Sequence, residues 1–313
     1  MKRITYFLSA AVLIIVASAF VVSRTSFKNE KKAKYKWTGV WQFTRTSSGD
    51  GITNLDIKIG KNVILFNVKE YANAIFNVNN QFPESKPWST LAVGNLERLI
   101  PTAQNMSDEQ QVAYLNEMNR LGVAVFIEIF PFKGEDVNVL IDQWLAKFKH
   151  YPNVIGLGVE LEYYGKATDD LAKAWDTAIK KHNPKYRLFL RHYDPEYMPQ
   201  TYRGKGDLIF VDHASEGDIK DLNQGFANWA NRFAPTACAF HIGYPADEDD
   251  MQGNNATGWW KLSNPIKEWG DGILPLIKDA NQELGLIWIT TKSGKTYNAS
   301  WDLTKGATLP KGK

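Results

Sequence analysis

Two glutamates, Glu160 and Glu162, close an otherwise apolar segment with the sequence YPNVIGLGVELEYYG, residues 151–165. Side chains alternate across a β-strand, so both glutamates share one face with Gly156 and Gly158. Carboxylates two residues apart on a strand lie about 7 Å from each other. In a poorly hydrated setting, their charges are expected to raise the pKa of one group, which stays protonated beside an ionised neighbour. General acid catalysis requires such a protonated group.

Polar or ionisable residues also close other apolar segments of the chain, and five consecutive segments, the third to the seventh, end in a titratable group. Each of these residues alone fits a hydrated rim as well as a catalytic role, so the set as a whole indicates a site. Besides the two glutamates, the set comprises Glu128, His192, Asp194, Asp212, His213, His241, Thr290, Thr291 and Lys292.

Eight short apolar segments are the predicted strands that position these residues. Segments that are apolar on both faces suit parallel strands covered by helices. Eight such strands close a (β/α)8 TIM barrel of about 250 residues, whose chemistry gathers at the carboxyl ends of the strands. A doubly wound open sheet is the alternative. The predicted strands span residues 39–44, 62–68, 122–130, 153–162, 186–193, 207–213, 236–244 and 284–291.

Helical patterns lie between most of these strands. Ser107 with Gln110 three residues later predicts a capping box, and Thr168 predicts a second helix start. No clear amphipathic helix is visible between residues 44 and 106. The predicted helices span residues 107–120, 136–149, 168–182, 217–232 and 264–282.

The N-terminus predicts a signal peptide or a membrane anchor. Lys2 and Arg3 precede an uncharged, mostly apolar run from Ile4 to Val22, which is close to the length of a single membrane span. Either interpretation places the rest of the chain outside the cytoplasm, secreted or anchored. The expected organisation is a leader or anchor (1–23), a basic linker (24–36), a barrel domain (37–305) and a frayed tail (306–313).

The charge balance argues against a nucleic-acid partner. Residues 1–36 hold eight of the 37 Lys and Arg residues and a single acid, Glu30, so the remainder carries 29 basic and 33 acidic residues. A mildly acidic body lacks the basic face that a phosphate backbone demands. Cys238 is the only cysteine, which excludes an intramolecular disulfide, and its apolar surroundings predict a buried thiol.

The end of the fourth segment resembles the fourth strand of TIM-barrel glycoside hydrolases. Chitinase-like enzymes of family 18 carry Asp-x-Asp-x-Glu there, and lysozyme-like enzymes of family 25 carry an acidic residue two positions before a Glu. YPNVIGLGVELE is also similar to the HPNVI…NE strand of the large retaining clan. The last Glu is the proton donor in these families, so the resemblance implies that role for Glu162 and a tuning or substrate-positioning role for Glu160.

The resemblance implies a glycoside hydrolase that acts on a polysaccharide or cell-envelope glycan, with no metal or cofactor expected, and the N-terminus predicts that it acts outside the cytoplasm. Gly158 and Leu161 depart from the family patterns, and His241 stands where the retaining clan has a nucleophilic Glu. Asp212 is the candidate base or nucleophile across the mouth, with Glu160 as the other option. Substrate-assisted hydrolysis, as in chitinase-like enzymes, needs neither of them.

Aromatic residues support a sugar substrate, because flat rings stack on the C–H faces of pyranoses while Tyr and Trp retain polar atoms for hydrogen bonds. The chain has eleven Trp residues. Tyr163, Tyr164, Tyr193, Tyr244, Trp259, Trp260 and Trp288 fall near predicted strand ends or loops. The predicted substrate-binding set is Glu128, Tyr164, His192, His213, His241, Tyr244, Trp260 and Trp288.

Two other functions remain open. His192, His213 and His241, with Asp212 or Glu162, are candidate ligands of a metal-dependent hydrolase or deacetylase, although the chain has no His-x-His or His-x-x-x-His pair. A barrel that binds glycan without cutting it is the other alternative, since fold does not imply activity.

Overall fold

The computed structural model describes residues 32–41, 68–94, 96–98, 106–214, 217–243, 259, 262–289 and 303–312. The chain divides into two compact units, Met1–Lys32 and Ala33–Lys313, and the second contains all the structure reported below. No helix among these described residues is both long and apolar enough to cross a membrane. The predicted signal peptide or anchor lies outside the described residues.

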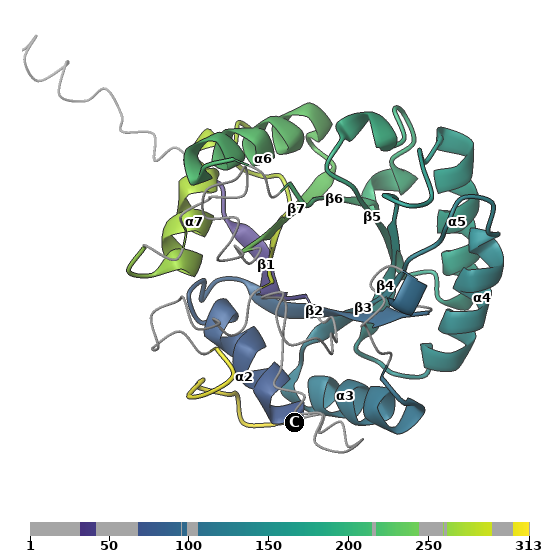
Figure 1. Ribbon diagram of the computed structural model, residues 1–313, viewed down its shortest axis with the longest axis horizontal. Helices are drawn as coiled ribbons and strands as arrows, with labels where there is room; N and C mark the ends of the chain where they lie inside the picture. The colour runs from purple at the N-terminus through teal and green to yellow at the C-terminus, as the bar shows by residue number, and fades with distance from the viewer. Residues whose placement is uncertain are drawn as a thin grey trace, which may run out of the picture. The chain divides into compact units, whose positions relative to one another are not determined.

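Eight parallel strands form a closed barrel in which each strand pairs with the next and β8 pairs with β1 (Figure 1). This confirms the predicted (β/α)8 barrel and excludes the open-sheet alternative. The strands are β1 (Tyr35–Val40), β2 (Lys86–Val93), β3 (Ala124–Ile129), β4 (Val154–Glu160), β5 (Arg187–Arg191), β6 (Ile209–Asp212), β7 (Ala237–Ile242) and β8 (Leu284–Trp288).

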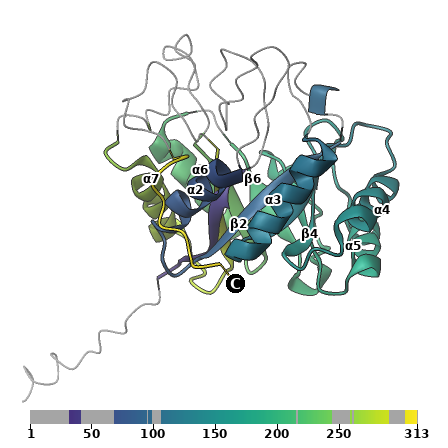
Figure 2. The same ribbon diagram turned by 90° about the horizontal axis from the view of Figure 1, so that it is seen from below.

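Helices surround the barrel (Figures 1 and 2). The predicted capping box of Ser107 and Gln110 is present at α3, and Thr168 caps α5 by accepting a hydrogen bond from the Leu171 N–H. The helices are α2 (Val68–Asn79), α3 (Asp108–Leu121), α4 (Val137–Phe148), α5 (Asp169–His182), α6 (Ile219–Phe233) and α7 (Pro265–Ile273).

The predicted second strand is wrong. Val68 begins helix α2, residues 62–67 lie outside the described residues, and β2 is Lys86–Val93. The apolar pattern of this strand is broken by Pro87, Ser89 and Thr90. The buried hydroxyl of Ser89 nevertheless has a hydrogen-bond partner, because it donates to the Val40 carbonyl over 2.7 Å.

Two other boundaries differ from the prediction. Strand β1 is Tyr35–Val40 instead of residues 39–44. Helix α7 ends at Ile273 and passes into a 3-10 turn, Leu274–Leu276, instead of continuing to residue 282. The proline at the centre of that turn explains the second difference, because it lacks the N–H that would continue the hydrogen bonds of the α-helix.

The glycine and glutamate face of β4 points into the barrel, as predicted. A Cβ on Gly158 would lie 1.9 Å from the Phe189 ring, so glycine makes room for aromatic packing in the interior. Phe189 also packs edge-on against Phe126, with ring centroids 5.2 Å apart. Apolar side chains thus fill the barrel beneath the carboxyl ends of its strands, and polar groups gather above them.

The C-terminal segment runs along helix α2, where it is drawn in yellow in Figures 1 and 2. The side chains of Asn73, Asn77 and Asn80 donate hydrogen bonds to the backbone carbonyls of residues 303, 304, 305 and 308. The segment predicted to be frayed is therefore tied down as far as Thr308.

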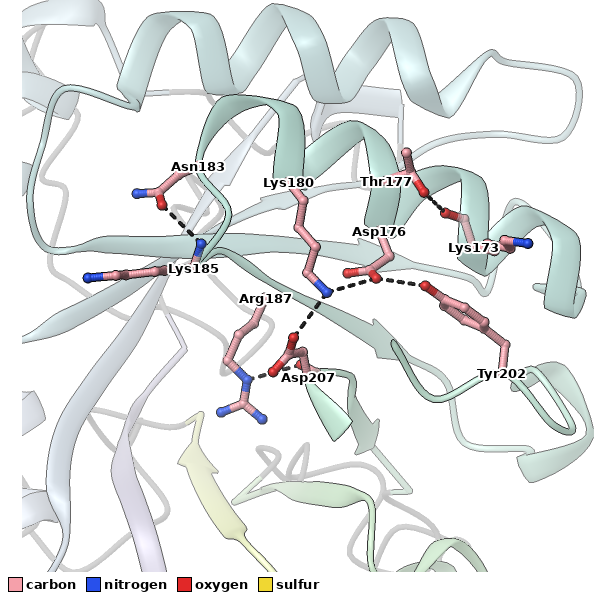
Figure 3. Close-up of polar contacts among 9 residues, drawn as sticks. All are labelled: Lys173, Asp176, Thr177, Lys180, Asn183, Lys185, Arg187, Tyr202 and Asp207. Atoms are coloured by element: carbon pink, nitrogen blue, oxygen red, sulfur yellow. Dashed lines mark hydrogen bonds and ion pairs between the residues drawn. The ribbon is translucent and has the colours of Figure 1, made fainter. Parts of the chain in front are cut away.

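The connection from β5 to β6 contains no α-helix and is completed by two 3-10 turns, Pro195–Tyr197 and Gly204–Gly206. A cluster of polar side chains links this connection to helix α5 (Figure 3). Buried Asp176 of α5 accepts hydrogen bonds from Lys180 over 2.9 Å and from the Tyr202 hydroxyl over 2.7 Å. Lys180 also donates to Asp207, at the amino end of β6. This is the end of the barrel where residues serve stability.

We expect Tyr202→Phe to lower the free energy of unfolding by about 1–2 kcal/mol, because it removes a hydrogen bond to a buried carboxylate and keeps the ring. Urea denaturation of the full-length protein measures this. Tyr151→Phe is the matched control, since the structure shows no hydrogen bond from the Tyr151 hydroxyl to a described residue, and it should change stability by less than about 0.5 kcal/mol. Equal effects of the two substitutions would contradict the role of the cluster.

Candidate active site

A buried guanidinium joins two carboxylates at the carboxyl ends of β3, β4 and β5. Arg191 donates from Nε to Glu128 Oε1 over 2.7 Å, and its Nη2 lies 2.5 Å from Glu160 Oε2. The indole N–H of Trp41 donates to the other oxygen of Glu128 over 2.6 Å. The four side chains form a continuous polar layer that fixes the two carboxylates in place.

Glu160 and Glu162 play unequal parts. Strand β4 ends at Glu160, whose side chain is 2% exposed, and Glu162 lies in the turn that follows with its side chain 41% exposed. The backbone N–H of Glu162 donates to Glu160 Oε1 over 2.9 Å. Glu160 therefore anchors the turn, and Glu162 is the carboxylate that solvent and ligands can reach.

The expectation that the two glutamates raise the pKa of one of them is not met at Glu162, the predicted acid. The pKa of Glu162 is lowered from its ordinary value, mainly by the ring of His213, whose Nε2 lies 3.6 Å from Glu162 Oε2, with further contributions from Arg191 and His192. His213, and not Glu160, is thus the neighbour that tunes Glu162. Burial raises the pKa of Glu128 instead.

The three predicted histidines do not form one cluster. His192 stacks on Tyr197 with ring centroids 3.8 Å apart, and His241 packs edge-on against Trp41 at 4.8 Å. Burial lowers the pKa of both. Among the described residues, the group able to present ligand atoms to one metal ion is Glu160, Glu162 and His213, so the predicted three-histidine ligand set is corrected.

Glu128 and His241 are completely buried and belong to the floor of the mouth, which corrects their prediction as substrate contacts. Trp288 is also completely buried, on the helix-facing side of β8, where it packs edge-on against Trp259 and Trp269. The prediction that Trp288 binds substrate is therefore corrected as well.

Asp212 lies on the wrong side of β6 for the predicted catalytic role. It shares a face with Phe210, which packs against Phe233 of α6, whereas the alternating residue Val211 belongs to the barrel interior. Asp212 accepts a hydrogen bond from the Ala214 N–H over 3.0 Å, closing the turn after the strand. Burial raises its pKa to about 7.

We expect Asp212→Asn to stabilise the protein increasingly as pH rises. The folded pKa of Asp212 lies above its unfolded value, so the folded state binds more protons between about pH 4 and pH 7, and stability falls across that range. Asparagine retains the acceptor for Ala214 and cannot ionise. Each pKa unit corresponds to about 1.4 kcal/mol, and burying an amide donor costs about 1–3 kcal/mol, so a net gain of about 2 kcal/mol is expected at pH 8.

Urea denaturation of both proteins at pH 5 and pH 8 checks this expectation. A stability difference that does not grow with pH would show that Asp212 titrates normally. Asp170→Asn provides the control, since Asp170 is exposed and forms no ion pair with a described residue.

Two exposed tyrosines stand at the rim of the mouth. Tyr163 is 43% exposed and contacts Phe132 with ring centroids 5.4 Å apart. Tyr193 is 54% exposed and packs edge-on against His213 at 5.4 Å. Tyr164, the predicted substrate contact, instead packs against Trp175 of helix α5. Tyr163 follows Glu162 in the chain, and Tyr193 packs on the His213 ring beside Glu162, so both exposed rings belong to the same rim as Glu162.

Several predicted residues lie outside the described residues: Tyr244, Trp260, Thr290, Thr291 and Lys292. Arg191 and Trp41, which hold the buried carboxylates, were not predicted. Alternation along YRLFLRHY places Arg191 on the same face as Phe189, and this signal was available in the sequence.

No family model matches the chain, and no curated protein matches it. Solved structures do. A GH99 endo-alpha-mannosidase from Bacteroides thetaiotaomicron is 8% identical over 82% of this chain and 85% of its own, with a TM-score of 0.48. The catalytic domain of a mannanase from Streptomyces sp. SirexAA-E is 12% identical over 88% of both chains, with a TM-score of 0.45.

An endo-beta-mannanase/endo-beta-glucanase from Prevotella bryantii is 11% identical over 82% of this chain and 45% of its own, with a TM-score of 0.47. All three neighbours are glycoside hydrolases. Identities this low concern the fold alone, so the side chains at the mouth decide what chemistry this barrel supports.

Proposed function

We propose that the protein is an extracytoplasmic glycoside hydrolase that cuts a polysaccharide or cell-envelope glycan, with Glu162 as its proton donor. The observation that carries the proposal is the reachable carboxylate of Glu162 at the barrel mouth, with the exposed rings of Tyr163 and Tyr193 on the same rim. A glycosidic bond needs a proton on its leaving oxygen and a surface that holds the sugar rings, and these residues supply both.

The division of labour follows from burial. Glu160 is held by Arg191 and by the Glu162 N–H, so its role is to position the turn that carries Glu162. His213 sets the protonation of Glu162. Asp212, which was predicted to be the catalytic base or nucleophile, faces the helices. We therefore do not include it in the proposed mechanism. Substrate-assisted attack by an acetamido group, which needs no second carboxylate, fits the remaining set.

The lowered pKa of Glu162 has a consequence for the reaction. An acid catalyst acts in its protonated form, and a lowered pKa leaves little of that form at neutral pH. The proposed enzyme therefore works best on the acidic side of neutrality.

The test is release of reducing ends by the full-length protein from a panel of glycans at pH 4 to 8. The panel pairs N-acetylated polymers, chitin and peptidoglycan, with mannan and glucan, which lack an acetamido group. Turnover that Glu162→Gln abolishes supports the proposal. Binding without turnover would favour the non-catalytic barrel, and loss of turnover on chelation would favour the metal-dependent alternative.

Location outside the cytoplasm rests on the N-terminal sequence and is tested separately. The full-length chain is expressed in cells, and protease is added while the cells are intact. The barrel is expected either to be digested by this protease or to be present in the culture medium. Protection from protease in intact cells, together with digestion after lysis, would contradict this part of the proposal.

A further inference from the structure

His213 is a buried histidine without a hydrogen bond among the described residues. Its side chain is 9% exposed, and its Nδ1 is buried without a partner. Its Nε2 lies 3.6 Å from Glu162 Oε2, which is longer than a hydrogen bond. The nitrogen that faces Glu162 therefore has no hydrogen bond within the described part of the chain, and a ligand beside Glu162 can reach it.

The surrounding groups form a ligand set of mixed type. One atom each from Glu160, Glu162 and His213 lies within 4.8 Å of the others. Two ligand atoms on a tetrahedral zinc ion lie about 3.4 Å apart, because each bond is about 2.0–2.2 Å long. A small rotation of the exposed Glu162 side chain would therefore bring all three onto one ion.

The charge at the mouth also favours a cation. Without Glu128, whose pKa burial raises, the carboxyl groups of Glu160 and Glu162 still outnumber the one guanidinium beside them, Arg191. Arg191 and the Glu162 N–H each engage one oxygen of Glu160, but a carboxylate has about four acceptor positions, so Glu160 retains lone pairs for an ion.

We propose that Glu160, Glu162 and His213 bind a divalent cation of the zinc class, and that the bound cation inhibits the protein by occupying the carboxylate of Glu162. An imidazole with two carboxylates suits zinc better than magnesium or calcium, which prefer oxygen ligands throughout. Cation binding stands on the ligand geometry alone, whereas inhibition rests on the proposed function.

Binding is tested by equilibrium dialysis of ZnCl2 against untagged full-length protein previously stripped with EDTA. One zinc per chain is expected, with Glu162→Gln and His213→Gln each weakening binding by about tenfold or more. Glu196→Gln and His150→Gln are the matched controls, since both side chains are exposed and His150 precedes the amino end of β4, opposite the mouth. Both variants should bind zinc like the wild type.

Thermal unfolding with and without zinc distinguishes loss of the cation site from misfolding of a variant. Zinc should raise the Tm of the wild type and of both controls but not that of Glu162→Gln, whose exposed side chain makes folding of the variant expected. Absence of saturable zinc binding, wild-type binding by Glu162→Gln and His213→Gln, or tighter binding of calcium or magnesium would each overturn the cation site.

Inhibition is measured on whichever glycan the protein hydrolyses, with zinc added and then removed by EDTA. The expected result is loss of activity with zinc and recovery with EDTA. Stimulation by zinc would overturn the inhibitory role and leave the cation site standing. If no glycan is hydrolysed, the proposed function fails, and the dialysis result still decides the cation site.

Discussion

Glu162→Gln should lower kcat for glycan hydrolysis by about 10²- to 10⁴-fold, the range typical of a removed general acid. Glutamine retains the shape of the side chain but cannot deliver a proton to the leaving oxygen. The side chain is 41% exposed, so the substitution should leave stability almost unchanged. Reducing-end kinetics at the pH optimum measure the loss, with Glu196→Gln as a surface control.

The nature of the leaving group sharpens this prediction. An aryl glycoside of an acidic phenol departs without needing a proton, so Glu162→Gln should affect it far less than it affects a natural glycan. Equal losses on both substrates would show that Glu162 acts in another way, and wild-type rates on the natural glycan would remove it from the reaction altogether.

Arg191→Met should lower the free energy of unfolding by about 3–5 kcal/mol, the cost of removing one partner from a buried ion pair. The guanidinium is 6% exposed and binds Glu128 and Glu160, whose side chains are 0% and 2% exposed. Methionine fills a similar volume but leaves both carboxyl groups without a cation, with only the hydrogen bonds from Trp41 to Glu128 and from the Glu162 N–H to Glu160. Urea denaturation near pH 7 measures the effect.

The matched control is Arg232→Met. Arg232 also pairs with a glutamate, Glu196, but their side chains are 41% and 59% exposed, and surface pairs contribute about 0–1 kcal/mol. Glu128→Gln added to Arg191→Met should restore part of the lost stability, because it removes one of the stranded carboxyl groups. An Arg191→Met variant no less stable than Arg232→Met would contradict the bridging role.

Much of the barrel could be predicted from the sequence because most of its strands are buried on both faces. The apolar segments that became β3 to β8 are continuous, and each overlaps its observed strand. Strand β2 was not predicted because Pro87 and two hydroxyl residues interrupt its apolar pattern. Such polar groups can be buried when another strand supplies a hydrogen-bond partner, as Val40 of β1 does for Ser89. The sequence of a single segment does not reveal that partner.

The site was predictable only as far as alternation within one strand allows. Alternation placed Glu160 correctly on the interior face of β4. The same rule applied to β6 would have placed Asp212 on the helix-facing side with Phe210, and applied to β5 it would have placed Arg191 inside. Position at a strand end alone does not determine which face of the strand a side chain occupies.

The electrostatics of Glu162 could not be predicted from its own strand. The residue that contributes most to its lowered pKa is His213, which follows β6, two strands further round the barrel and fifty-one positions later in the chain. Spacing within a segment therefore suggested that Glu160 tunes Glu162, and closure of the barrel brought a different neighbour to the carboxylate.

The measurement that most directly tests proton donation by Glu162 is the pH dependence of kcat/KM for wild type and His213→Gln, with EDTA present to exclude cations. The activity of an enzyme whose acid is Glu162 falls as pH rises through the pKa of that group in the free protein. His213→Gln removes the main cause of the lowered pKa, so the falling limb should move to higher pH. A limb that stays in place, or moves to lower pH, would contradict the assignment of Glu162 as the proton donor.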